Sequence, residues 1–471
     1  MKMRKMAILL NSLIIVISVI LLIINDSYDE TLLQCIIVLA VLSVLSFFMV
    51  TSKIEKLRGQ WLRASYVFLI GYLVVFFQYN LDLVVHNTTV ANSVFASTDS
   101  ICTAALMSLI GLSSFVIGTN SCLLYSRESQ VKYMGLISNK HLLIQKSLFV
   151  FFVVVYLYYN ATNILFGRFE YSEDSMAESA GSFSNYSSVM ILALSFTILS
   201  TNVYNARLSK IKLSVIKFFQ MNGLMFNIPL LAYLSFVFMT GDRGPIITIV
   251  LAYAITCVIA CDKKVHLLTL ALVVVAGGTL LTIIGNVRRE THMLTLHELA
   301  SYRDSRGVES VLPATLELAG SYNTFTYSVQ KVPSAHDYFY GTMKLRDIGY
   351  SVPFLYRLMP FAYSDKGYEN GTSSYCTYLI QGLNRTYGNG SSLLADIYID
   401  FGVIGIVIIM FFLGKFIIRI DYNLFSGRSI CSLMIGVVFF SFSIYWSRAT
   451  LVTPLYYIVP SYIILYCRKF V

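Results

Sequence analysis

The stretch MAILLNSLIIVISVILLII, residues 6–24, carries no charged side chain. A helix needs about 20 consecutive apolar residues to cross the hydrocarbon core of a bilayer, so this stretch predicts a membrane span. Similar stretches recur along the 471-residue chain, and 13% of its residues are charged, whereas a typical soluble domain has about 25%. The sequence therefore predicts an all-α polytopic membrane protein.

About twelve such spans set the organisation of the chain. They are predicted near residues 6–24, 31–50, 64–85, 100–124, 147–166, 185–201, 220–239, 245–260, 267–285, 393–414, 429–447 and 453–467. One long connector, residues 286–392, separates the ninth span from the tenth. The chain is thus predicted to comprise residues 1–285 with nine helices, this large loop, and residues 393–471 with three helices.

Charged residues sort the short connectors into two sets. If the N-terminus is cytoplasmic, the cytoplasmic connectors and both chain ends hold 22 of the 35 basic residues and four of the 25 acidic ones. The short loops on the other side hold only Arg168, Arg243 and Arg448 as basic residues. Because short cytoplasmic loops are enriched in Lys and Arg, both termini are predicted to be cytoplasmic and the large loop extracytoplasmic.

The large loop has the composition of a folded unit. It keeps apolar residues at helical spacing, as in Leu312, Leu316 and Ala319, and it contains 12 of the 33 tyrosines. Aromatic side chains with a polar tip suit the binding of ring-shaped polar ligands by stacking and hydrogen bonding. We therefore expect this loop to be structured and to bind such ligands.

Composition also argues against several classes of ligand. The net charge of +10 lies mostly in short loops between apolar segments, so no nucleic-acid partner is expected. The eight cysteines and six histidines show no metal-ligand spacing, and the sequence contains no glycine-rich phosphate-binding motif. Neither a metal ion nor another cofactor is expected.

Several arginines are predicted at the membrane edge on the side of the large loop. Arg243 lies in TGDRGP, just before the proline expected to open the next helix, and Arg288 and Arg289 follow the ninth span. A guanidinium is a planar, charged fork that suits phosphate oxygens, and a helix N-terminus adds amide donors. We interpret these arginines, with Arg448 as a weaker candidate, as phosphate-binding residues. The alternative is anchoring at lipid headgroups or, for Arg243, pairing with Asp242.

Acidic residues supply the candidate proton-transfer groups. Asp396 and Asp400 begin the tenth span and lie four residues apart, so they share one helix face. Carboxylates in an apolar helix are costly and usually face a cavity or a partner. Asp396 is a candidate for orienting or deprotonating a hydroxyl, unless the pair bridges to loop arginines. Glu317 is a candidate for orienting an arginine or the acceptor, or an ordinary surface charge.

These residues belong to a pattern that resembles the Wzy-type O-antigen polymerases over most of the chain. The marks, in chain order, are Gly241–Pro245, Arg288, Glu317–Gly320, Asn323–Thr324, Val332–Pro333, Tyr340–Gly341, Met359–Pro360, Gly390–Ser392, Asp396–Tyr398, Phe401–Gly402 and Gly405. The family favours Glu and Asn where this chain has Asp396 and Asp400. The first position stays acidic, whereas the second changes from an amide to an acid.

The resemblance implies a metal-independent glycosyltransferase with a GT-C-like architecture in a bacterial inner membrane. It would join undecaprenyl-pyrophosphate-linked oligosaccharides through its large periplasmic loop, with membrane lipid and a chain-length regulator as candidate partners. In this interpretation Arg243 and Arg288 stabilise the departing pyrophosphate, and Asp396 or Glu317 orients or deprotonates the acceptor hydroxyl. The candidate substrate-binding residues are Arg289, Arg448, Asp400, Tyr398 and Asn323.

Two alternative functions share parts of this pattern. An O-antigen ligase has a similar architecture, but its pattern includes a histidine near the last junction of loop and helix, where this chain reads Asn389-Gly-Ser-Ser392. A flippase or exporter of lipid-linked sugar is expected to have short loops and charges deep within its spans. Mid-span charge is scarce here, so the polymerase is favoured over both alternatives.

Overall fold

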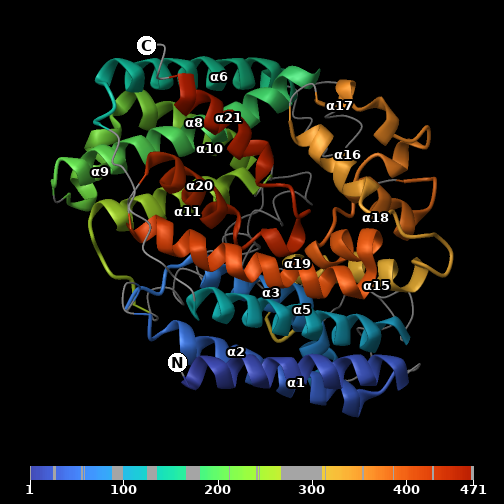
Figure 1. Cartoon of the computed structure of the whole chain (residues 1–471). Coiled ribbons are helices and arrows are strands. Elements are labelled where there is room, and N and C mark those ends of the chain that lie inside the picture. The colour runs from blue at the N-terminus through green and yellow to red at the C-terminus, as the bar shows by residue number, and fades with distance from the viewer. Residues whose placement is uncertain are drawn as a thin grey trace.

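The computed structural model is built from helices wherever it describes a regular element (Figure 1). It describes residues 2–24, 28–54, 57, 59–86, 99–124, 135–165, 181–211, 213–239, 242, 244–266, 310–312, 315–352, 355–385, 387–426 and 429–467. The prediction of an all-α protein is therefore confirmed for these residues.

Nine helices of the described residues precede the large loop. They are α1 (Lys2–Ile24), α2 (Glu30–Thr51), α3 (Ala64–His86), α5 (Asp99–Leu124), α6 (Asn139–Leu165), α8 (Gly181–Leu208), α9 (Val215–Asn222), α10 (Leu224–Met239) and α11 (Gly244–Ala260). The loop contributes α14 (Leu316–Ala319), α15 (Tyr322–Lys331), α16 (Thr342–Ser351), α17 (Leu355–Leu358), the 3-10 helices η3 (Pro360–Ala362) and η4 (Gly367–Glu369), and α18 (Thr372–Gln381). The chain ends with α19 (Leu393–Ser426), α20 (Ile430–Phe442), η5 (Trp446–Arg448) and α21 (Leu455–Tyr466).

Seven helices of the described residues are long and apolar enough to cross a membrane: α1, α2, α3, α5, α6, α8 and α19. The bent pair α9 and α10 counts as an eighth span if it is taken as one, and α11, α20 and α21 are shorter apolar helices. The polytopic character is therefore confirmed. The predicted span at 267–285 lies outside the described residues, and the total of twelve remains a prediction.

One predicted span is broken by a sharp bend. A span was predicted near residues 220–239, but α9 ends at Asn222 and α10 begins at Leu224, with an angle of 93° between them. Gly223 lies between them at a φ of 78°, a conformation that glycine adopts readily and other residues avoid. The Asn222 side chain accepts a hydrogen bond from Asn202 and donates one to Tyr253, both 2.7 Å long.

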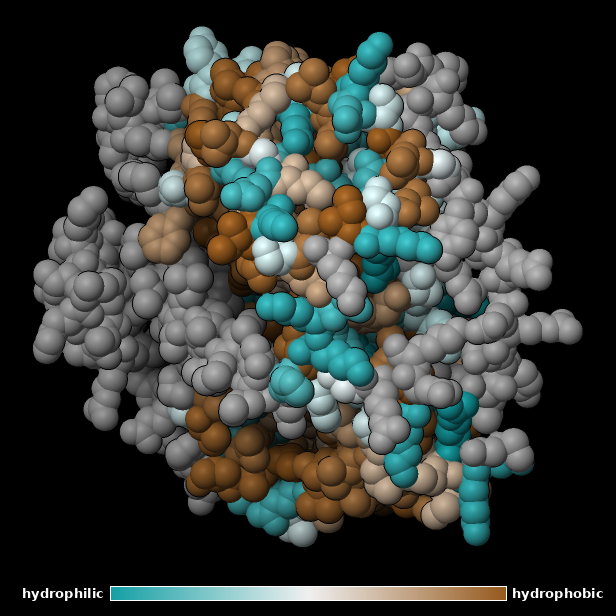
Figure 2. Space-filling view, turned by 90° about the vertical axis from the view of Figure 1, so that its left-hand side faces the viewer, coloured by the Kyte–Doolittle hydropathy of each residue, from teal (hydrophilic) through white to brown (hydrophobic). Residues whose placement is uncertain are grey.

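The long helices run side by side, and the loop helices gather at one end of the bundle (Figure 1). α19 runs through the middle and packs against α5 and α20, while α5 also contacts α1 and α2. α1 begins and α21 ends at the end opposite to the loop helices α15 to α18. Figure 2 views that opposite end, where polar side chains gather across the middle and hydrophobic ones lie below them. The loop helices are thus held over one end only.

α5 and α19 approach closely because glycines lie at their crossing. A Cβ atom at Gly118 would collide with the carbonyl oxygen of Phe411, and one at Gly414 would collide with that of Phe115. The Thr119 hydroxyl lies 3.4 Å from the carbonyl oxygen of Gly414, as a hydrogen-bond donor across the interface. Small residues allow membrane helices to pack backbone against backbone. This crossing therefore sets the position of α19, which carries Asp396 and Asp400.

We expect Gly118→Ala to destabilise the bundle by about 1–3 kcal/mol, because the added methyl group meets backbone that cannot move aside as a side chain can. The thermal unfolding temperature of the detergent-solubilised protein measures the effect. Gly135→Ala is the matched control, since a Cβ atom there meets nothing within 4 Å. Equal unfolding temperatures for the two variants would contradict the close crossing.

Candidate active site

The site is built around a break in α19. Gly402 has a φ of 61° and a ψ of −156°, so the helical course is interrupted there. The two carbonyl groups just before the break, of Ile399 and Asp400, accept hydrogen bonds from the backbone N–H groups of Phe339 and Tyr340, each 3.0 Å long. These hydrogen bonds join the chain segment that precedes α16 to the part of α19 just before the break.

The Asp400 carboxylate caps the helix that follows this segment. Its Oδ1 accepts hydrogen bonds from the N–H groups of Gly341 (3.0 Å) and Met343 (3.3 Å) at the start of α16. Gly341 is the N-cap residue, in a left-handed conformation with a φ of 92°. A negative charge at a helix N-terminus is favourable because the free N–H groups and the helix dipole point at it. Asp400 therefore fixes the direction in which α16 leaves the break.

Lys344, in the first turn of α16, lies between the two aspartates of α19. Its Nζ is 2.5 Å from Asp396 Oδ1 and 2.9 Å from Asp400 Oδ2. The lysine side chain is 10% exposed and both carboxylates are fully buried. Burial lowers the pKa of Lys344, but the charges of Asp396 and Asp400 outweigh it and raise the pKa above its ordinary value. We call these three residues the buried ion trio; with all of them charged it carries a net charge of −1.

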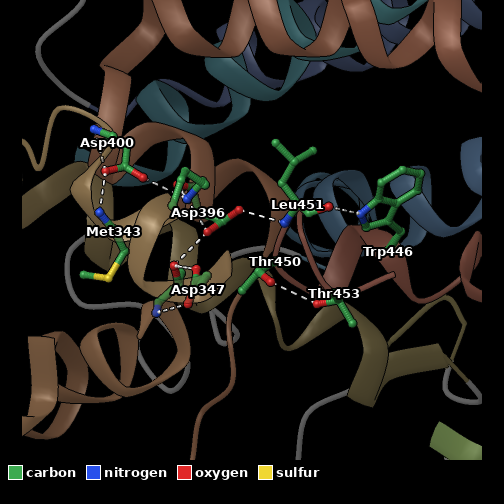
Figure 3. Close-up of polar contacts among 11 residues, drawn as sticks. Met343, Asp347, Asp396, Asp400, Trp446, Thr450, Leu451 and Thr453 are labelled. Carbon is green, nitrogen blue, oxygen red and sulfur yellow. Dashed lines mark hydrogen bonds and ion pairs between the residues drawn. The ribbon is translucent and has the colours of Figure 1, made fainter. Parts of the chain in front are cut away.

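Asp396 also ties two further segments to this trio. Its Oδ1 accepts a hydrogen bond from the Thr372 hydroxyl of α18 (2.8 Å), and its Oδ2 accepts one from the N–H of Leu451 (2.8 Å). Figure 3 shows this line of contacts, from Asp347 through Asp396 to Leu451. Leu451 belongs to the connection between η5 and α21. One carboxylate thus holds together two loop helices and the last connection of the chain.

Asp347 lies one helical turn after Lys344 and shares Thr372 with Asp396. Its Oδ1 accepts a hydrogen bond from the N–H of Thr372 (3.1 Å), and its Oδ2 lies 2.6 Å from the Thr372 hydroxyl. Burial and the negative charge of Asp396 raise the pKa of Asp347 to about 6, against the opposing effects of Lys344 and Thr372. Asp347 is therefore an acidic group that titrates close to neutral pH.

A pocket of about 470 Å³ opens beside Asp347. Its walls come from α16, α18 with the residues before it, and the connection from η5 to α21, and they include Arg448. Hydroxyl, amide and tyrosine side chains make up much of the lining: Tyr350, Asn370, Thr372, Ser373, Ser374, Ser391, Thr450, Thr453 and Tyr456. The volume lies within the range of about 300–1,000 Å³ that is usual for small-molecule sites. The pocket thus presents a carboxyl group, a guanidinium and many hydrogen-bonding groups to one ligand.

The residues singled out in the sequence occupy different places. Arg448 lines the pocket, whereas Asp396 and Asp400 lie buried behind it in the ion trio. Tyr398 is buried and its hydroxyl donates to the carbonyl oxygen of Val332 (2.9 Å), and Asn323 lies in α15. Arg243, Arg288 and Arg289 lie outside the described residues, as does the side chain of Glu317. Their roles therefore remain predictions.

Three residues of the site, Lys344, Asp347 and Thr372, were not singled out in the sequence. Lys344 and Asp347 belong to the stretch TMKLRDIGYS, where three charges within four positions are typical of a solvated helix face. The sequence suggested loop arginines as one alternative partner of Asp396 and Asp400, and the partner is instead a loop lysine. The available signal was the apolar setting of the two aspartates, which required a nearby cation.

We expect Lys344→Met to destabilise the protein by about 3–5 kcal/mol, because it leaves two buried carboxylates without their cation. The unfolding temperature in detergent measures the effect, with Lys366→Met as the control. Lys366 also pairs with an acid, Glu369, at 3.3 Å, but its side chain is 63% exposed, and exposed ion pairs contribute little to stability because water screens the charges. A similar small effect for both variants would contradict the role of the trio.

The chain was compared with protein families, with curated proteins and with solved structures. The family model for the O-antigen polysaccharide polymerase Wzy matches residues 7–471, essentially the whole chain. Curated proteins and solved structures give no match. The family, together with the long apolar helices, indicates a multi-pass membrane enzyme that transfers glycosyl groups to build a polymer. The chain thus belongs to the O-antigen polysaccharide polymerase Wzy family.

Proposed function

We propose that this protein joins undecaprenyl-pyrophosphate-linked oligosaccharide repeat units at the periplasmic face of a bacterial inner membrane. The transfer takes place in the pocket between α16, α18 and the η5–α21 connection. The observation that carries the proposal is that Arg448 and Asp347 line one pocket at the end of the bundle where the loop helices gather. A lipid-linked substrate needs such a place, where the lipid tail stays beside the membrane helices and the sugars reach a polar cavity.

The pyrophosphate of the donor is the group that needs most stabilisation. Arg448 offers a planar fork of N–H donors to its oxygens. A pyrophosphate carries more charge than one guanidinium neutralises, so Arg243, Arg288 and Arg289, all predicted at the same side of the membrane, are proposed to complete the binding site. The hydroxyl and amide side chains of the pocket then bind the sugars, together with Tyr350 and Tyr456, the tyrosines among the lining residues.

The reaction exchanges one bond at the anomeric carbon of the growing chain. A hydroxyl oxygen of the acceptor unit attacks this carbon, and its bond to the pyrophosphate oxygen breaks. The electron pair of that bond leaves with undecaprenyl pyrophosphate, where negative charge accumulates. Preorganised donors at the place where charge develops lower the barrier more than donors in water do, which is the role proposed for the arginines.

The alternatives predict different products. A ligase would move the finished glycan to another acceptor, and a flippase would move the lipid-linked unit across the membrane without forming a bond. Neither is favoured by a family match that covers essentially the whole chain. A chain-length regulator is a proposed partner of the polymerase.

Surface glycan from cells that lack this protein tests the proposal directly. We expect a gel of the surface lipid to show single repeat units in these cells and a ladder of longer chains after complementation with the wild type. Complete absence of capped lipid in the null strain would contradict polymerisation and assign the protein to transport or ligation.

Within the same complementation assay we expect Arg448→Ala to abolish the ladder and Arg448→Lys to restore only part of it, because lysine keeps the charge but loses the fork. The loss of one donor at a developing charge costs about 10²–10³-fold in rate. Arg357→Ala is the matched control, since Arg357 lies in α17 of the large loop and does not line the pocket. A wild-type ladder from Arg448→Ala, at equal protein level, would exclude Arg448 from the site.

A further inference from the structure

We propose that Asp347 is the catalytic base of this transfer, and that the buried ion trio and Thr372 hold it at the pocket wall. The inference deepens the proposed function and rests on it. The sequence pointed to Asp396 or Glu317 for this task, whereas the arrangement of the described side chains points to Asp347.

Access to the pocket distinguishes Asp347 from the two aspartates of α19. Among the described residues that line the pocket, Asp347 is the one acidic residue. Asp396 has no exposed surface, and its carboxylate is held by Lys344 and Thr372 on one side and by Leu451 on the other. Asp347 keeps 8% of its surface exposed, although Thr372 contacts both of its carboxylate oxygens. Asp396 is thus placed to position other groups, and a hydroxyl bound in the pocket meets Asp347.

The position of the Thr372 hydroxyl between two carboxylates favours protonation of Asp347. This hydroxyl has a single hydrogen, yet it lies 2.6 Å from Asp347 Oδ2 and 2.8 Å from Asp396 Oδ1. While both carboxylates are ionised, it can donate to only one of them. Once Asp347 carries a proton on Oδ2, it donates to Thr372, and Thr372 donates to Asp396. Both short contacts are then satisfied hydrogen bonds.

Electrostatics favour the same proton uptake. The buried ion trio has a net charge of −1, and its negative charge on Asp396 disfavours a second negative charge on Asp347. The charged and titratable groups around Asp347 are Lys344 on its own helix, Asp396 on α19, Cys376 on α18, Tyr363 after η3, Tyr456 on α21, and Arg448 across the pocket. A group that titrates near the working pH is the most effective base, because it is ionised before the reaction and still accepts a proton.

The proposed transfer is a single displacement at the anomeric carbon, coupled to proton transfer to Asp347. The O–H bond of the acceptor hydroxyl breaks and its proton binds Asp347, while the oxygen forms the new bond to the anomeric carbon. The bond from that carbon to the pyrophosphate oxygen breaks, and its electron pair leaves with the pyrophosphate. One negative charge therefore moves from Asp347 to the leaving group, which is the group proposed to face Arg448. The proton returns to solvent through the pocket after the product leaves.

Asp347→Asn tests the proposal, because the structure can accommodate an amide at this position. Its Oδ1 still accepts from the N–H of Thr372, and its NH₂ group donates to the Thr372 hydroxyl, which then donates to Asp396. The variant mimics protonated Asp347 and cannot act as a base. We expect the purified protein in lipid vesicles, supplied with undecaprenyl-pyrophosphate-linked repeat units, to polymerise about 10²–10⁴-fold more slowly, with an unchanged unfolding temperature.

Two further variants complete the test. Asp347→Glu keeps a carboxylate and should retain part of the activity, and Asp365→Asn removes an exposed carboxylate of the same loop and should match the wild type. The wild-type rate should fall as the pH drops through about 6, the pKa of Asp347, because the base must be ionised. A fully active Asp347→Asn, or a wild-type rate that does not change between pH 7 and 5, would overturn the role of Asp347 alone. A wild type that makes no polymer would overturn the proposed function as well.

Discussion

Lys344 lies buried between Asp396 and Asp400, and the end of the molecule that holds the candidate active site is assembled around this contact. Two carboxylates on one face of an apolar helix are tolerated only with a cation beside them, because an unpaired buried charge costs several kcal/mol. The lysine comes from the large loop. If the loop detached from α19, the two aspartates would lose their cation or become exposed to solvent. The glycine break in α19 and the capping of α16 by Asp400 place the lysine within reach. Asp396 extends the same contact to Thr372 and to Leu451.

The pocket is a consequence of this assembly. Its walls are the segments that Asp396 and Lys344 hold together, namely α16, the start of α18 and the connection after η5. A carboxyl group and a guanidinium on these walls suit a displacement in which negative charge moves from the base to the leaving group. In the proposed mechanism the buried ion trio does not touch the substrate but holds Asp347 in position. Burial and the charge of Asp396 raise the pKa of Asp347, and Lys344 opposes them.

The helices were largely predictable, because the thickness of a bilayer fixes the length of the apolar stretches whatever the rest of the fold does. The breaks within these helices were not predictable from the sequence. Hydropathy does not record the positive φ of Gly223 or Gly402, and glycine is common in membrane helices that remain straight. The shared face of Asp396 and Asp400 followed from their spacing, but their partner lies 52 residues before Asp396 and in no periodic relation to it. Asp347 was missed for a different reason, since a charged stretch in a loop is typical of a solvated helix.

The most direct measurement is a cryo-electron microscopy structure of the full chain with an undecaprenyl-pyrophosphate-linked repeat unit bound. Transfer in this pocket predicts density for the pyrophosphate against the Arg448 guanidinium and for a sugar within hydrogen-bond distance of Asp347. The lipid tail should then leave the pocket toward the apolar faces of the membrane helices. A donor bound elsewhere, with the space between Arg448 and Asp347 empty, would contradict the assignment of this pocket as the site of transfer.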